Sequence, residues 1–230
     1  MSIVQVLPEL TAAGGTQMAL DRGLLETAEQ VIARRYLWDP PALSLGRFQK
    51  ITLAGDLPFD VVRRPTGGRA VLHGAEFEWS FAVAFPPGSF GEGPAAAAVS
   101  APYDLVSVAF AAALDELGVA LDQGREAAYQ RSALCFASAL RHDLLSRGEK
   151  IVAVAQARRG GRVLVHGSVL ERRPPEELAA AAARLCSEPW QGEGLAGAGY
   201  QLVPETLWHT VLARLEAGLR RLAASRPNAV

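Results

Sequence analysis

The most informative stretch of this sequence is Arg63-Arg64-Pro65-Thr66-Gly67-Gly68-Arg69-Ala70-Val71-Leu72-His73. It joins three arginines to a Gly-Gly turn, directly after the short run from Phe59 to Val62. Paired glycines let main-chain amides approach a ligand closely, and guanidinium groups hold phosphate or carboxylate in a planar fork. The stretch is therefore typical of a loop that binds an anionic group. A Gly-Gly pair alone more often marks an ordinary hairpin turn, so the rest of the chain must decide between these interpretations.

The composition is that of an ordinary soluble domain. A chain of 230 residues is long enough for one sizeable core and short for two, so we expect a single domain over residues 1–230, with no accessory C-terminal domain. The formal net charge of −1 provides no overall field for nucleic acid or an anionic membrane. No apolar run approaches the roughly 20 residues of a membrane span, and the N-terminus lacks a secretory signal. We expect a cytoplasmic protein with no nucleic-acid or membrane partner.

Cysteine and histidine usage predicts no metal site. Cys135 and Cys186 are too few for a disulfide framework or a cysteine-only zinc site. The four histidines do not adopt a metal-ligand spacing such as H-E-x-x-H. Lys50 and Lys150 are the only lysines, and every other cation is arginine. In such a lysine-poor chain, a lysine inside a motif is less readily explained as surface; Lys50, outside any motif, is assigned to the surface.

Periodicity predicts interleaved helices and strands. Helices are expected over residues 16–35, with Thr16 as the cap, and over 105–117, 174–186 and 205–224. Strands are expected over 42–45, 59–63, 76–85 (half exposed), 150–155 and 163–170, the last two paired around a turn at 159–161. Loops rich in glycine are expected over 86–102 and 187–204. This order predicts an α+β (α/β-like) fold, a mixed sheet flanked by helices.

Several segments, taken together, resemble one known family. They are residues 63–73, Glu149-Lys150-Ile151-Val152-Ala153-Val154-Ala155-Gln156, Val165-His166-Gly167-Ser168-Val169-Leu170, Cys135-Phe136, Met18-Ala19-Leu20-Asp21 and Ser44-Leu45-Gly46-Arg47-Phe48-Gln49. In this order, over roughly residues 10 to 170, they resemble the lipoate-protein ligases and octanoyltransferases. The motifs are specific as a set and weak singly. The resemblance implies the catalytic-domain fold shared with biotin protein ligases.

The acyl-transfer chemistry of this family is the reason why we predict Cys135 and Lys150 as the catalytic residues. A carrier-protein thioester donor requires a nucleophile that holds the acyl group between donor and acceptor. The octanoyltransferases common in Gram-positive bacteria, which this chain resembles most closely, place a cysteine before the lysine strand, in a context like that of Cys135. Since unperturbed cysteine has a pKa of about 8.5, a nearby cation raises its thiolate fraction. The resemblance implies that Lys150 lies at the acyl carbonyl, where it would also stabilise charge on the thioester oxygen.

Structural interpretations of these residues stay open beside the catalytic ones. Cys135 could be a buried structural thiol, and Lys150 a solvated lysine at a strand end. Cys186 also competes for the role of nucleophile, because a second octanoyltransferase group places its cysteine about twenty residues past the His-Gly strand. That group uses a Pro-Cys-Gly context, which is absent around Cys186, so we expect Cys186 to be a packed helix thiol.

The remaining candidates are assigned to substrate binding. His73 would order the diglycine loop or line the acyl slot, although a core histidine is also possible. Gly167 would allow close backbone approach at the opposite wall. The whole predicted substrate-binding set is Arg63, Arg64, Thr66, Gly67, Gly68, Arg69, His73, Gln156, His166, Gly167 and Ser168. A further group, Arg158, Arg159 and Arg162, would either meet the acidic face of an acyl carrier protein or form a solvated turn.

The sequence departs from the family pattern beside the predicted site. Ala153-Val154 replaces the usual Gly-Ser before Ala-Gln, which removes a hydroxyl and a permissive backbone position. Gly74 follows His73 where aspartate is common. Residues 76–80 replace the Gly-Asn pattern of ATP-using ligases and look closer to the transferases.

The leading prediction is an octanoyltransferase of lipoyl assembly that needs no cofactor. It would move octanoyl from an acyl carrier protein, through a thioester on Cys135, to a lysine of a lipoyl domain, in the glycine cleavage H protein or a dehydrogenase E2. One alternative is an ATP-dependent lipoate-protein ligase that forms an acyl-adenylate and uses ATP and Mg²⁺. The other is a non-catalytic homologue that binds an acyl group or a partner.

Overall fold

The computed structural model describes residues 2–52, 55–91, 99–122 and 132–225. The strands are β1 (Val4–Val6), β2 (Leu10–Ala12), β3 (Val31–Trp38), β4 (Ala42–Leu45), β5 (Asp60–Arg63), β6 (Val71–His73), β7 (Glu78–Phe85), β8 (Leu144–Ser146), β9 (Glu149–Arg159) and β10 (Arg162–Leu170). The helices are α1 (Gly14–Thr27), α2 (Ser100–Glu116), α3 (Glu176–Cys186), α4 (Gly194–Gly197) and α5 (Pro204–Ala224). A short 3₁₀ turn covers Cys135–Ala137. Among the described helices, none is both long and apolar enough to cross a bilayer.

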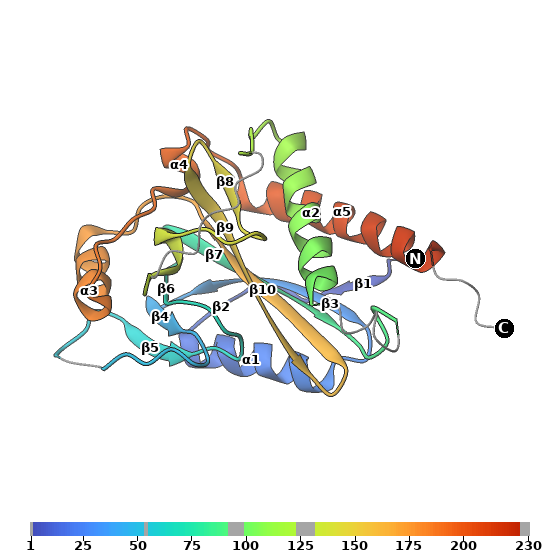
Figure 1. Ribbon diagram of the computed structural model, residues 1–230, viewed down its shortest axis with the longest axis horizontal. Coiled ribbons are helices and arrows are strands. Elements are labelled where there is room, and N and C mark those ends of the chain that lie inside the picture. Colours follow the sequence, from blue (N-terminus) through green and yellow to red (C-terminus); the bar gives the residue numbers. More distant parts are fainter. Residues whose placement is uncertain (1, 53–54, 92–98, 123–131, 226–230) are drawn as a thin grey trace.

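A seven-stranded sheet forms the centre of the fold, in the order β1-β3-β7-β10-β9-β8, with β2 also paired to β3. β1 and β2 run parallel to β3, and the remaining pairs are antiparallel. Figure 1 shows α1 on one side of this sheet and α2 and α5 on the other. The predicted mixed sheet flanked by helices is confirmed.

Alternation along β7 explains the two helical layers. Trp79, Phe81, Val83 and Phe85 join the core that contains residues of α2 and α5. Ala82 and Ala84 face the α1 side. All eight residues of the strand are buried, so the expected half-exposed strand is wrong. Both faces of the sheet are covered, and the polar residues of β7 lie inside the protein instead of facing water.

A second sheet, ordered β5-β4-β6, stands beside the first. β4 runs parallel to β5 and antiparallel to β6. The stretch Arg63 to His73 leaves β5, crosses over as a loop and returns as β6. Gly46 is required at its crossing point, because a Cβ there would lie 2.0 Å from the carbonyl oxygen of Gly68. Gly68 itself has φ +97°, a backbone region that favours glycine.

Several predicted boundaries need correction. The helix expected over 16–35 ends at Thr27, and Val31–Trp38 is strand β3; the β-branched pair Val31-Ile32 fits helical spacing, but pairing of β3 with β7 decides the outcome. Ala13 occupies the N-cap position in place of Thr16, with no side-chain cap bond. The helix expected over 105–117 already begins at Ser100. Of the expected loop over 86–102, residues 92–98 lie outside the described part, and the loop over 187–204 contains the short α4.

Other predicted elements are confirmed. The strand expected over 42–45 matches β4, and those expected over 150–155 and 163–170 are β9 and β10, paired antiparallel. Gly160 and Gly161 form the turn between β9 and β10, with φ of 55° and 78°. The helices expected over 174–186 and 205–224 correspond to α3 and α5.

Candidate active site

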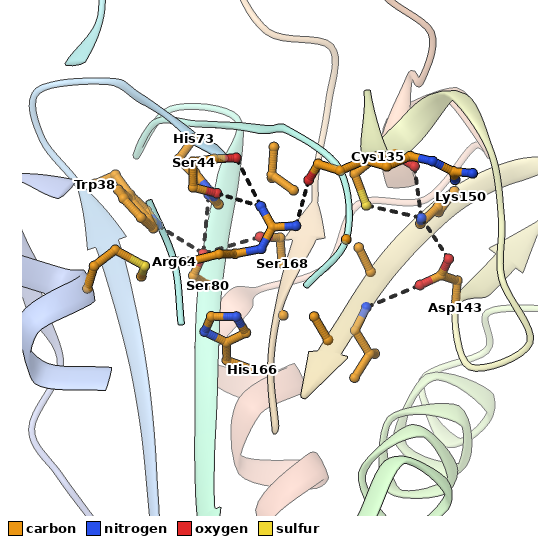
Figure 2. A pocket seen from close by; sticks show the side chains of 18 of the residues that line it. Trp38, Ser44, Arg64, His73, Ser80, Cys135, Asp143, Lys150, His166 and Ser168 are labelled. Carbon is orange, nitrogen blue, oxygen red and sulfur yellow. Dashed lines mark hydrogen bonds and ion pairs between the residues drawn. The ribbon is translucent and has the colours of Figure 1, made fainter. Parts of the chain in front are cut away.

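A cavity of about 340 Å³ lies where the small sheet meets the central sheet. Its walls come from the Arg63–His73 stretch, from the facing parts of β7, β9 and β10, and from α1 and β3. Figure 2 shows Cys135, Lys150 and Asp143 together on one side of it, and Trp38 on the opposite side. Of the predicted site residues, the lining includes Arg64, Gly68, Arg69, His73, Cys135, Lys150, His166, Gly167 and Ser168. Residues that are far apart in the sequence therefore meet at one compact site.

Cys135 and Lys150 are in direct contact. Lys150 Nζ donates to Cys135 Sγ over 3.3 Å, to the Cys135 carbonyl over 2.9 Å and to the Ser138 carbonyl over 3.0 Å. It also forms an ion pair with Asp143 at 2.7 Å. Lys150 is 4% exposed, so the solvated strand-end interpretation is wrong. The predicted pair of thiol and ammonium is thus present inside the cavity wall.

The environment favours the charged form of Lys150. Burial is the largest single influence and lowers its pKa, but the negative charges of a Cys135 thiolate and of Asp143, with their hydrogen bonds, outweigh it, so the pKa is raised. Lys150 therefore presents a fixed positive charge beside Cys135.

Backbone hydrogen bonds hold Cys135 against the diglycine stretch. The Cys135 amide donates to the Ala70 carbonyl over 2.8 Å, and the Ala70 amide donates to the Ala133 carbonyl over 2.9 Å. Ala70 and Leu134 form a parallel bridge. The segment that carries Cys135 is therefore paired, through its backbone, with the stretch from Arg63 to His73. Neither sequence motif alone predicts this pairing.

Cys186 occupies a different environment. It lies at the end of α3, is buried and is absent from the cavity lining. Burial, with a smaller contribution from Glu188, raises the pKa of its thiol to about 11. The expected packed helix thiol is confirmed.

Arg64 organises the loop that follows β5. Its Nε donates to Thr66 Oγ1 over 3.2 Å, and its Nη1 donates to the Ser44 carbonyl over 2.9 Å and to Ser44 Oγ over 3.2 Å. Its Nη2 donates to the carbonyls of Gly67, over 3.0 Å, and Arg69, over 2.6 Å. In the described part of the chain, no carboxylate lies within ion-pair distance of Arg64. Burial lowers its pKa, and the loop carbonyls compensate the buried charge.

Two histidines are linked to the Arg64 guanidinium group, each through a hydroxyl that accepts a hydrogen bond from it. The first is His166. His166 Nδ1 lies 2.8 Å from Asp21 Oδ2, and its Nε2 lies 2.7 Å from Thr66 Oγ1. Since a carboxylate only accepts, Nδ1 of the ring carries the proton. Thr66 in turn accepts from Arg64. The result is a chain of hydrogen bonds from α1 through β10 to the loop.

The second chain runs through His73. Its Nδ1 lies 3.2 Å from Glu78 Oε2, and its Nε2 lies 2.7 Å from Ser44 Oγ, which also accepts from Arg64. The ring stacks on Trp38 with a centroid separation of 3.9 Å. Burial lowers the pKa of His73. Both histidines therefore line the cavity as fixed, hydrogen-bonded groups.

The comparisons with known proteins agree with this site. Residues 14–184 match the model of the lipoyl protein ligase A/B catalytic domain. The chain belongs to the lipoyl protein ligase A/B catalytic domain family. The octanoyltransferase LipM of Carboxydothermus hydrogenoformans is 34% identical over 178 residues, covering 72% of this chain and 64% of the relative. LipM of Kyrpidia tusciae is 37% identical over 162 residues, covering 63% of this chain and 56% of the relative. The chain thus spans less than two thirds of the length of these relatives.

Solved structures show the same fold. A T. acidophilum protein with bound lipoic acid aligns with a TM-score of 0.70 at 17% identity, covering 95% of this chain and 86% of that one. Lipoate-protein ligase A bound with ATP aligns with a TM-score of 0.65 at 18% identity, covering 98% of this chain and 96% of that one. At these identities the likeness concerns the fold alone.

Four predicted substrate-binding residues do not line the cavity of this family member. Arg63 is exposed and donates to the carbonyls of Gly46, Arg47 and Gln49. Thr66 and Gly67 contribute hydrogen bonds to the Arg64 network from behind the lining. Gln156 donates through Nε2 to the Val99 carbonyl over 2.8 Å, and its main-chain N–H donates to the Tyr103 hydroxyl over 3.1 Å. These residues shape the loop and the sheet around the cavity.

Gly167 and the Ala-Val replacement have clear positions. A Cβ on Gly167 would lie 2.1 Å from the Ala153 carbonyl oxygen and 2.6 Å from the Phe81 ring, so β10 needs glycine there for packing. Ala153 and Val154 line the cavity where the family usually carries Gly-Ser. The Val154 amide donates to Asp143 Oδ1 over 3.2 Å. The replacement therefore adds apolar surface to the cavity wall and keeps a backbone contact to the site.

The arginines of the β9–β10 turn are engaged within the chain. Arg159 forms an ion pair with Glu26 of α1, and Arg162 with Glu29 just beyond it. Arg162 also donates to the Ala28 carbonyl over 2.9 Å. Arg159 is largely exposed, with 66% of its side chain accessible. The β9–β10 turn therefore presents a charged surface next to the C-terminal end of α1.

Sequence reasoning missed several residues of the site. Asp143 lies in a stretch without periodicity and has no motif around it, so nothing marked it. Asp21 and Ser44 lie in segments that resemble the family, but no chemical pattern in the sequence assigns them a role. Glu78 and Ser80 lie in the strand that the sequence predicts to be half exposed over 76–85. The signal for a site is that polar residues recur in an otherwise apolar strand that follows a histidine. Within the described residues, no group of three or more histidine, cysteine or carboxylate side chains is placed to hold a metal ion.

Proposed function

We propose that this chain is an octanoyltransferase of lipoyl assembly, in which Cys135 carries the acyl group from an acyl carrier protein to a lipoyl-domain lysine. The observation that carries the proposal is the contact of 3.3 Å between Cys135 Sγ and the buried Lys150 Nζ at a mostly apolar cavity. A thiol and an ammonium group in contact are the groups that a thioester exchange requires. The LipM relatives support the octanoyl group as the cargo.

The cavity has the properties expected for a medium-length acyl chain. Its volume of about 340 Å³ lies at the lower end of the range for ligand pockets, roughly 300–1,000 Å³. Val71, Ala153 and Val154 contribute apolar wall next to Cys135 and Lys150. An acyl chain attached to Cys135 would extend along this wall toward Trp38, on the opposite side in Figure 2.

In the first half of the reaction, the Cys135 thiolate attacks the carbonyl carbon of the donor thioester. A bond forms between that carbon and Sγ, the bond to the donor sulfur breaks, and the donor leaves as a thiolate that takes a proton from solvent. The Lys150 ammonium stabilises the thiolate before attack and the negative oxygen during it. Neither ATP nor a metal ion takes part, because the donor is already activated.

In the second half, the neutral amine of the acceptor lysine attacks the Cys135 thioester. The new carbon–nitrogen bond gives the amide, the carbon–sulfur bond breaks, the Cys135 thiolate is restored, and the amine proton goes to solvent. A structural neighbour at a TM-score of 0.60, the bipartite lipoate protein ligase from Thermoplasma acidophilum, is described together with its E2 lipoyl domain. This supports a lipoyl domain as the acceptor, and we place the reaction in the cytoplasm.

A transfer assay tests the proposal against its alternatives. A lipoyl domain is incubated with the protein and either octanoyl-acyl carrier protein without ATP, or octanoate with ATP and Mg²⁺, and its mass is measured. The octanoyltransferase gives an octanoylated domain only with the carrier-protein donor. Product only from octanoate with ATP would establish the ligase, and no product from either donor would establish the non-catalytic homologue.

A further inference from the structure

Asp143 is the fixed carboxylate at the site. Its Oδ2 lies 2.7 Å from Lys150 Nζ and accepts from the Leu140 amide over 2.7 Å, while its Oδ1 accepts from the Val154 amide over 3.2 Å. Only 3% of its side chain is exposed. Backbone amides from two segments therefore hold this carboxylate against Lys150, at a position that no sequence motif indicated.

Lys150 has more acceptors than donors. Its ammonium has three N–H groups and four acceptors within reach: Cys135 Sγ, the carbonyls of Cys135 and Ser138, and Asp143 Oδ2. The two carbonyls are neutral. The charges available to balance the ammonium are therefore a thiolate at Cys135, when that thiol is ionised, and the Asp143 carboxylate; acylation of Cys135 removes the first of them.

We propose that Asp143 is the positioning residue that keeps Lys150 protonated while Cys135 carries the acyl group. Lys150 then acts as a positive hydrogen-bond donor in both halves of the reaction, and it is not the base that takes the acceptor's proton. Burial alone can lower the pKa of a lysine by up to about 3–5 units, so a buried lysine without a charged partner would lose its proton near neutral pH. The catalytic meaning of this step rests on the proposed octanoyltransferase function.

Other charged groups around the site do not replace Asp143. Arg64 acts on Cys135 electrostatically, and Arg69 donates to Ser138 Oγ. These cations disfavour a charged Lys150. The rings of Tyr103 and His142 stack on each other with centroids 4.5 Å apart, and both groups are close enough to Asp143 for its charge to act on them. In the described part of the chain, Asp143 is the one carboxylate within ion-pair distance of Lys150.

The lysine content of the chain makes this proposal directly measurable. Since Lys50 and Lys150 are the only lysines, NMR of protein labelled with ¹³C or ¹⁵N at the lysine side chain gives two titrating signals, and Lys50→Arg assigns them. Iodoacetamide converts the Cys135 thiol to a neutral thioether, which reproduces the loss of the thiolate charge. The titration midpoint of Lys150 is then compared in alkylated wild type and alkylated Asp143→Asn.

We expect Lys150 to stay protonated at pH 8 in alkylated wild type. In alkylated Asp143→Asn, the proton affinity of Lys150 should fall at least tenfold. Asp143→Glu should recover part of that loss. Asp122→Asn is the matched control: Asp122 is an exposed carboxylate that caps the amides of Arg147 and Gly148 before β9, and its removal should leave the midpoint unchanged. Equal midpoints in alkylated wild type and Asp143→Asn would overturn the proposal.

Two further outcomes separate this proposal from the proposed function. If Asp143→Asn does not fold, the alkylated wild type still decides: a Lys150 that is deprotonated at pH 8 overturns the role of Asp143. If the titrations agree with the proposal but no variant transfers octanoyl, the proposed function fails and the electrostatic role of Asp143 stands.

Discussion

Cys135 Sγ and Lys150 Nζ lie 3.3 Å apart although fifteen residues separate them in the chain. The two residues are held in place by different parts of the fold. Lys150 is fixed in β9, the strand beside β10 in the central sheet, while Cys135 is fixed against Ala70 by the small sheet and its loop. Cys135 therefore has a buried ammonium against its sulfur, whereas the thiol of Cys186 is influenced by burial and by Glu188.

Alkylation should distinguish the two cysteines. At pH 7.5, a thiol with the pKa of Cys186, about 11, is ionised in only about one molecule in several thousand. Cys135 is less buried and contacts Lys150. Brief treatment with iodoacetamide followed by peptide mapping should label Cys135 at least tenfold faster than Cys186. Equal labelling of the two peptides in the folded protein contradicts this interpretation.

The glycine in β10 should be required for packing. Gly167→Ala places a methyl group 2.1 Å from a carbonyl oxygen of β9, and we expect it to lower the free energy of unfolding by about 1–3 kcal/mol, the usual cost of overpacking. Urea denaturation measures this change. Gly23→Ala is the control, since its Cβ meets nothing within 4 Å inside α1; it should stabilise by about 0.5–1 kcal/mol. A Gly167→Ala protein as stable as wild type would show that the sheet can adjust.

Arg64 should not tolerate lysine. Its guanidinium satisfies five acceptors from the loop and from Ser44, and a lysine has only three donors. Because each unsatisfied buried polar group costs about 1–3 kcal/mol, Arg64→Lys should lower the free energy of unfolding by about 2–4 kcal/mol. Arg63→Lys changes the exposed neighbour and should cost less than about 1 kcal/mol. The two denaturation midpoints, measured side by side, test the assignment; a similar small loss in both would refute it.

Acid should destabilise the protein through His73. Burial lowers the pKa of this ring in the folded state, so the unfolded chain takes up the proton first, near pH 6.5. The contribution to stability is therefore complete above about pH 6.5 and is lost as the pH falls through the lower folded-state pKa. Urea denaturation at pH 7.5 and pH 5 should show a smaller drop in His73→Gln than in wild type. Part of the drop should remain in His73→Gln, because burial also lowers the pKa of His142. A drop as large as that of wild type would show that His73 does not contribute to the loss of stability in acid.

The central sheet could largely be predicted from the sequence, because its long elements have clear patterns. The β9–β10 hairpin has an apolar strand on each side of a Gly-Gly turn, and α3 and α5 have strong helical periodicity. The error at residues 16–35 had a local cause, since Val31 and Ile32 fit both a helix and a strand. Only the pairing of β3 with β7 separates these possibilities, and pairing between distant segments leaves no local signal.

The site could be predicted in part. Lys150 and Cys135 were found because the chain resembles a family and contains few lysines. Asp143 was missed because its function comes from backbone amides of Leu140 and Val154 that meet only in the folded chain. The hydrogen bonds of Arg64 were missed for the same reason: the sequence shows a cationic loop, but the carbonyls that hold the guanidinium are visible only in three dimensions.

The most direct test of an acyl-enzyme is the mass of the protein itself. After incubation with octanoyl-acyl carrier protein alone, wild type and Cys186→Ser should gain one octanoyl group, removable by hydroxylamine, and peptide mapping should place it on Cys135. Cys135→Ser should gain no hydroxylamine-sensitive group. An octanoyl group on Cys186, or rapid transfer to the lipoyl domain by Cys135→Ser, would contradict the central claim that Cys135 carries the acyl group.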